Sequence, residues 1–126
     1  MTTLLSNVNW LAVIVGTVLS FGLGMVWFGQ IFGKIWATGS HGITPPDSLP
    51  LGAMLAQFIG TFLLALVVGA TETIQDLPTA LVAILGFAAL QLGGSLFSQK
   101  STGAALVDGG FILAMGVVMI GAQGIL

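Results

Sequence analysis

The chain has 126 residues, of which 56% are hydrophobic and only 5% are charged, whereas soluble domains carry about 25% charged residues. This composition suits lipid rather than water as the surrounding solvent. The formal net charge of -2 disfavours nucleic acid as a partner, and the absence of cysteine excludes disulfides, thiolate catalysis and thiolate metal sites.

Four long apolar runs predict four transmembrane helices, because about 20 residues at 1.5 Å per residue cross roughly 30 Å of hydrocarbon. The expected spans are residues 9–29, 50–71, 78–97 and 103–125. We therefore predict an all-α integral membrane protein, a four-helix bundle with short loops that forms a single transmembrane domain over residues 1–126. No Lys or Arg precedes the first run, so we expect it to be retained as a span rather than cleaved as a signal peptide.

Polar residues and prolines mark the expected helix starts. Asn9 is the candidate cap of the first span, Ser48 of the second and Asp76 of the third. Pro50 and Pro78 fit the first turn of a helix, where an amide hydrogen is not needed. The starts of these three spans are thus predicted independently of their hydropathy.

Aromatic residues indicate where the chain meets the membrane surface. Trp10 and Trp27 lie at the two ends of the first span, and Trp36 lies in an apolar stretch within residues 30–40 that predicts a short interfacial helix. Indole rings prefer the headgroup level, so all three are candidate interface anchors. The alternative for Trp10 and Trp27 is that they are ordinary core aromatics.

The two lysines predict the orientation. Lys34 and Lys100 lie in the first and third loops, which share one side of the membrane, and the positive-inside rule places both loops in the cytoplasm. Both termini and the 72–77 turn then face the periplasm or outer side. The expected location is the inner (plasma) membrane of a bacterium.

A stripe of small residues predicts close helix packing. Ala12, Gly16, Ser20 and Gly24 recur at every fourth position of span one, and small residues let helix backbones approach closely in lipid. Shorter runs with the same four-residue spacing occur at Gly52, Ala56 and Gly60, at Ala89 and Gly93, at Ala105 and Gly109, and at Gly110 and Ala114. We expect a homo-oligomer or association with other membrane-protein subunits, and the sequence leaves open whether the stripe packs internally or between subunits.

Polar side chains on three spans are predicted to share one depth. Gln57, Gln91 and Asp108 each lie roughly 7 to 11 Å from the expected cytoplasmic helix ends, and Ser95 lies one turn from Gln91. An ionisable group within a membrane normally faces protein or water. These four residues therefore form the candidate intramembrane polar cluster.

Asp108 has two possible roles. It can serve as a proton- or cation-linked site lined by two amides, or it can form a structural clasp, paired with Lys34, with Lys100 or with exposed backbone amides. The clasp is favoured because Asp108 lies close to the interface and lysine side chains can reach towards it.

Most enzyme and cofactor classes are disfavoured. The single histidine, His41, lies in a loop without a nucleophile or carboxylate at a recognisable spacing, and no span contains a haem-ligating histidine. We predict no catalytic residue, no metal site and no cofactor. Small multidrug exporters are similar to this chain in size, but span one here lacks their coupling glutamate.

Two stretches resemble a bacterial membrane family catalogued as domain of unknown function 1761. The first comprises Asn9-Trp10-Leu11-Ala12-Val13, Gly24, Trp27-Phe28-Gly29, Phe32-Gly33-Lys34 and Trp36, and the second is Ala105-Leu106-Val107-Asp108-Gly109-Gly110-Phe111. Spans two and three are similar only in hydropathy, and Phe28 stands where that family often has Tyr. The resemblance implies a four-helix inner-membrane protein and brings no activity with it.

Two functions remain in view. The first is a noncatalytic structural or accessory subunit of a larger membrane complex, or a self-associating bundle, as expected for a chain without an extramembrane domain. The second is a small oligomeric transporter or channel that uses the layer of Gln57, Gln91 and Asp108.

Overall fold

A computed structural model of the chain describes residues 6–42 and 51–126, and this part is helical without strands. Its elements are α2 (Trp10–Met25), the π-helical turn η1 (Val26–Ile31), α3 (Gly33–Gly39), α4 (Leu51–Thr73), α5 (Leu77–Phe97) and α6 (Thr102–Ile125). Four helical segments are long and apolar enough to cross a membrane: α2 together with η1, α4, α5 and α6. The predicted all-α class with four spans is confirmed, and each observed bound lies within about two residues of the expected one.

Side-chain caps begin three of the four long helices. Asn9, Asp76 and Ser101 each accept a hydrogen bond from the amide three residues later, at 3.1, 3.2 and 3.1 Å. The caps predicted at Asn9 and Asp76 are thus observed, and each one satisfies an amide that the first turn leaves without a partner. Ser48 and Pro50, the predicted start of α4, lie outside the described residues.

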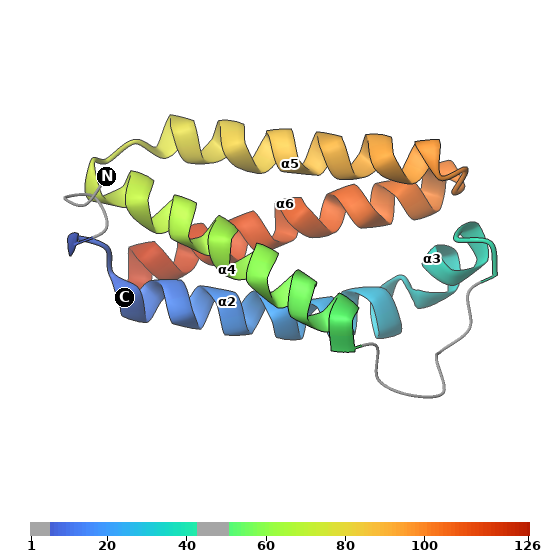
Figure 1. The fold of residues 1–126 in the computed structure, drawn as a ribbon, viewed down its shortest axis with the longest axis horizontal. Coiled ribbons are helices and arrows are strands. Elements are labelled where there is room, and N and C mark those ends of the chain that lie inside the picture. The colour runs from blue at the N-terminus through green and yellow to red at the C-terminus, as the bar shows by residue number, and fades with distance from the viewer. Residues whose placement is uncertain (1–5, 43–50) are drawn as a thin grey trace.

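The four long segments run lengthwise through the molecule (Figure 1). The start of α2, the end of α6 and the α4–α5 turn lie at one end of the bundle, while α3 and the α5–α6 turn lie at the other. Among these helices α6 is the most enclosed, because 50% of its apolar 18-residue stretch is buried, against 22 to 28% for the others. It is the central helix on which α2, α3 and α5 pack.

The small-residue stripe of α2 packs against α6. A Cβ atom at Gly16 would lie 3.5 Å from the Cα of Met119, and one at Gly24 would lie 3.1 Å from the ring of Phe111. Ala12 and Ser20 of the stripe are buried as well. The stripe therefore makes an internal contact, which answers the question that the sequence left open.

Helix α4 packs tightly only along its second half. All of its buried residues lie at Thr61 or beyond, and a Cβ atom at Gly69 would lie 2.8 Å from Val13 of α2 and 3.0 Å from Gln123 of α6. Helices that cross at an angle separate away from their point of closest approach. The first half of α4 accordingly diverges from α5 towards the α3 end of the bundle (Figure 1), and a Cβ atom at Gly52 or Gly60 would have no neighbour within 4 Å.

Candidate functional site

The divergence of α4 leaves a large groove with walls from α2, α4, α5 and α6. Its volume is about 750 Å³, within the range of small-molecule pockets. The apolar part of its lining includes Phe21, Phe28, Leu63, Phe87, Phe111 and Met115. The polar part is small and includes Trp36, Gln57, Gln91, Lys100 and Asp108.

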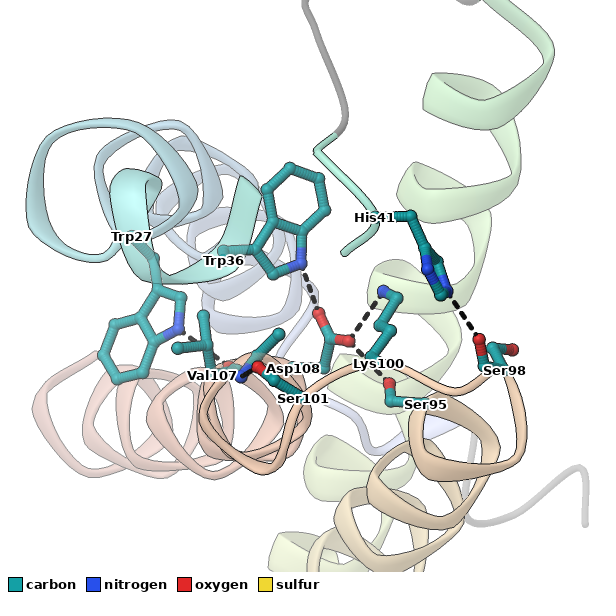
Figure 2. Close-up of polar contacts among 10 residues, drawn as sticks. Trp27, Trp36, His41, Ser95, Ser98, Lys100, Ser101, Val107 and Asp108 are labelled. Carbon is teal, nitrogen blue, oxygen red and sulfur yellow. Dashed lines mark hydrogen bonds and ion pairs between the residues drawn. The ribbon is translucent and has the colours of Figure 1, made fainter. Parts of the chain in front are cut away.

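Asp108 lies at the polar end of this groove and is held by three side chains (Figure 2). Its Oδ1 accepts a hydrogen bond from Trp36 Nε1 at 2.8 Å. Its Oδ2 accepts one from Ser95 Oγ at 2.5 Å and forms an ion pair with Lys100 Nζ at 2.9 Å. We call these four residues the Asp108 clasp, since they join α3, α5, the α5–α6 turn and α6.

The clasp compensates the burial of a charge. Asp108 is only 5% exposed, and a buried carboxylate is tolerated when it is paired and hydrogen-bonded. Lys100 also lies 5.5 Å from the centre of the Trp36 ring, a distance at which a cation is attracted to the aromatic face. Two of the three partners of Asp108 therefore also contact each other.

Further contacts hold α3 and the residues after it against the end of the bundle. The amide of Ser101 donates a hydrogen bond to the carbonyl of Gly39 at 2.9 Å, and His41 Nε2 lies 2.8 Å from the carbonyl of Ser98. A Cβ atom at Gly39 would collide with Ser101 and Ala104. Glycine is therefore required where α3 meets the start of α6.

The π-helical turn η1 orients Trp27 towards α6. The amide of Phe32 bonds to the carbonyl of Trp27 at 3.0 Å, five residues back, and Trp27 Nε1 donates to the carbonyl of Val107 at 2.9 Å. Such single turns often occur at functional sites. This turn was not predictable from the sequence, because one additional residue in a helical turn leaves the hydropathy of an apolar run unchanged.

The predicted interface anchors have different environments. Trp10 is 43% exposed at the start of α2, whereas the indole N–H groups of Trp27 and Trp36 donate to acceptors within the protein. Ring contacts with Phe28 and Phe111 also surround these two indoles. Trp27 and Trp36 thus tie elements together at one end of the bundle.

The structure brings most of the predicted polar cluster together. Gln57 and Gln91 line the same groove as Asp108, and Ser95 is a direct partner of Asp108. Both glutamine side chains are exposed, and neither makes a hydrogen bond within the described part of the chain. The two amides therefore face the groove with free donors and acceptors.

Of the two lysines predicted as ion-pair partners of Asp108, the structure places one beside it. Lys100 pairs with Asp108, whereas Lys34 is exposed on α3 and forms no ion pair with any described residue.

The hydrogen bond from Trp36 to Asp108 was not predicted from the sequence. The two residues are 72 positions apart, and no sequence motif marks an indole N–H as the partner of a carboxylate. Within residues 6–42 and 51–126, no three His, Asp or Glu side chains gather as a possible metal site.

Comparisons with known proteins identify one family for this chain. No curated protein and no solved structure matches the chain. The sequence model of one family, described as a protein of unknown function (DUF1761), matches residues 11–123. This match includes Trp36, Ser95, Lys100 and Asp108, and it covers all but the ends of the chain. The chain therefore belongs to the DUF1761 family.

Proposed function

We propose that this protein is a noncatalytic membrane protein that binds an amphipathic molecule from the bilayer in the groove between α4 and α5. The observation that carries the proposal is the groove itself, about 750 Å³ with an apolar lining and polar groups that include Gln57, Gln91 and Lys100. Pockets for small ligands combine a mostly apolar wall with a few polar groups that orient the ligand. An oligomer that carries such a molecule across the membrane would be the small transporter that the sequence allows.

A matched pair of glycines on α4 tests this function. Gly60 lines the groove and Gly52 does not, while a Cβ atom at either position would have no neighbour within 4 Å. We expect the native mass spectrum of the gently extracted protein to include a bound small molecule. Gly60→Phe should abolish this bound mass by filling the groove, and Gly52→Phe should retain it. Equal retention by both variants would refute the groove as the binding site.

A second candidate is an accessory subunit or a self-associating bundle. It is supported by α4 and α5, because only 22% of the apolar 18-residue stretch of each helix is buried. Wide faces of both helices are therefore free to contact lipid or another protein. The same native mass spectrum separates the cases. A fixed stoichiometry with other chains supports the accessory subunit, and a defined multiple of the chain mass supports self-association. A monomer that carries only the small molecule supports the binding function and neither of these two alternatives.

We also propose a bacterial inner-membrane location with α3 and the α5–α6 turn in the cytoplasm. Lys34 and Lys100 lie at this end of the bundle, and the positive-inside rule is the support for the assignment. The chain ends and the α4–α5 turn would then face the periplasm. In this orientation the groove's polar end lies at the cytoplasmic leaflet.

A further inference from the structure

We infer that the occupant of the groove is a phospholipid with a zwitterionic headgroup, its phosphate beside Lys100 and an acyl chain along the apolar wall. This inference rests on the proposed binding function and names its ligand class. Three observations carry it: the position of the polar groups, the length of the apolar wall and the charge balance at the polar end.

The polar groups lie nearer one membrane surface than the other, a short way below the ends of the helices. Gln57, Gln91 and Asp108 are each six residues from the nearer end of α4, α5 and α6, which is about 9 Å along a helix. These three helix ends belong to the α3 end of the bundle (Figure 1). The polar end of the groove therefore faces one membrane surface.

The apolar wall has the length that an acyl chain needs. On α4 the lining beyond Gln57 extends to Val67, which is about 15 Å at 1.5 Å per residue. One leaflet occupies about 15 Å, half of the roughly 30 Å of hydrocarbon. A chain anchored at the polar end can thus lie in the groove over a length equal to the thickness of one leaflet.

The groups open to the groove are chiefly hydrogen-bond donors. The Asp108 carboxylate already accepts from three side chains and is buried. The ammonium of Lys100 has three N–H groups and donates one to Asp108, and the Lys100 side chain as a whole is 20% exposed. With the free amides of Gln57 and Gln91, it presents donors to an anionic oxygen such as that of a phosphate.

Charge balance then selects the headgroup. Lys100 and Asp108 together are neutral, so a bound phosphate introduces one uncompensated negative charge in a region of low dielectric, which is unfavourable. An ethanolamine headgroup carries its own ammonium, and the amide oxygens of Gln57 and Gln91 can accept from it. A glycerol headgroup carries no cation, so phosphatidylethanolamine is favoured over phosphatidylglycerol.

Native mass spectrometry of the full chain, reconstituted with equal amounts of phosphatidylethanolamine and phosphatidylglycerol, tests this inference. We expect one retained phospholipid and about a tenfold preference for phosphatidylethanolamine, since one charge-assisted hydrogen bond corresponds to roughly that factor. The double variant Gln57→Leu/Gln91→Leu leaves the Asp108 clasp and the apolar wall in place. It should lose most of the headgroup preference and still bind an acyl chain.

The glycine pair separates failure of this inference from failure of the proposed function. If Gly60→Phe removes a molecule that contains no phosphorus and Gly52→Phe retains it, the groove binds a ligand but the phospholipid assignment is wrong. Equal retention of the two lipids by the unmodified protein overturns the headgroup assignment alone. If both glycine variants retain the same lipid, the groove is not the site and both proposals fail. Thermal unfolding of each variant checks that it is folded.

Discussion

At the scale of single residues, Asp108 is the most constrained side chain of the site. Its two oxygens accept from Trp36, Ser95 and Lys100, with distances between 2.5 and 2.9 Å. Three donors of this kind satisfy most of the acceptor capacity of a carboxylate. The geometry therefore supports the clasp over the proton-linked site, because a carboxylate held by three partners is poorly placed to bind a passing ion.

Asp108→Asn should destabilise the protein by about 1–3 kcal/mol, because the ion pair is lost and charge-assisted hydrogen bonds become weaker neutral ones. Titration with dodecyl sulfate in mixed micelles, followed by circular dichroism, measures the free energy of unfolding. Lys34→Met is the control and should change it by less than about 0.5 kcal/mol, since Lys34 is exposed.

A double-mutant cycle with Lys100→Met isolates the ion pair. The effects of Asp108→Asn and Lys100→Met should not add, since the two side chains contact each other. Additive effects, or a stable Asp108→Asn variant that loses flux of an ion in vesicles, would instead favour the transport site.

At the scale of elements, the contact between α5 and α6 depends on glycines of α6. A Cβ atom at Gly116 would lie 2.7 Å from two atoms of Ile84, and one at Gly109 would lie 3.2 Å from the carbonyl oxygen of Ala88. In lipid, close packing rather than the hydrophobic effect holds helices together. These glycines therefore determine how near α5 can lie to α6.

Gly116→Ala and Gly121→Ala form a matched test of this packing on one helix. Gly116→Ala should destabilise by about 1–3 kcal/mol through overpacking against Ile84. At Gly121 a Cβ atom would have no neighbour within 4 Å, so Ala there should be neutral or stabilise by up to about 1 kcal/mol. The free energy of unfolding in mixed micelles compares the two. Equal effects would show that the α5–α6 contact is looser than described.

At the scale of the whole molecule, one end of the bundle is closed and the other carries the groove. Near the α4–α5 turn, α4 is tightly packed through Gly69 on α2 and α6. At the other end, where α3 lies and α4 diverges from α5 (Figure 1), the groove is lined by Trp36, Lys100 and Asp108 of the clasp. The polar end of the groove thus lies nearer one membrane surface than the other, so the orientation would decide which leaflet supplies the proposed ligand.

Single cysteines test the proposed orientation, because the natural chain has none. Gln75 and Gln99 are exposed turn residues with similar positive φ angles of 54° and 63°, so Gln75→Cys and Gln99→Cys carry similar backbone strain. In intact cells with a permeable outer membrane, an impermeant maleimide should label the cysteine at 75. The one at 99 should react only after the inner membrane is opened. The reverse pattern would invert the orientation.

Much of the architecture is predictable because local chemistry determines it. The apolar runs, with Asn9 and Asp76 as caps, suffice to place the spans, since a lipid-exposed backbone must satisfy its own hydrogen bonds as a helix. The depth of Gln57, Gln91 and Asp108 follows from counting residues along helices. That these three residues line one groove was not predictable from their depth, since residues at the same depth can face different sides of a bundle.

The sequence by itself determined the class, the four spans and the small-residue face of α2, because these depend on hydropathy and spacing along one helix. Only the tertiary structure decided that Lys100 rather than Lys34 pairs with Asp108, that Trp36 completes the clasp, and that α4 diverges to leave the groove. These features depend on the packing of α3 against α6 and on the point where α4 approaches its neighbours most closely. Both arise from packing between residues far apart in the chain, which no local pattern records.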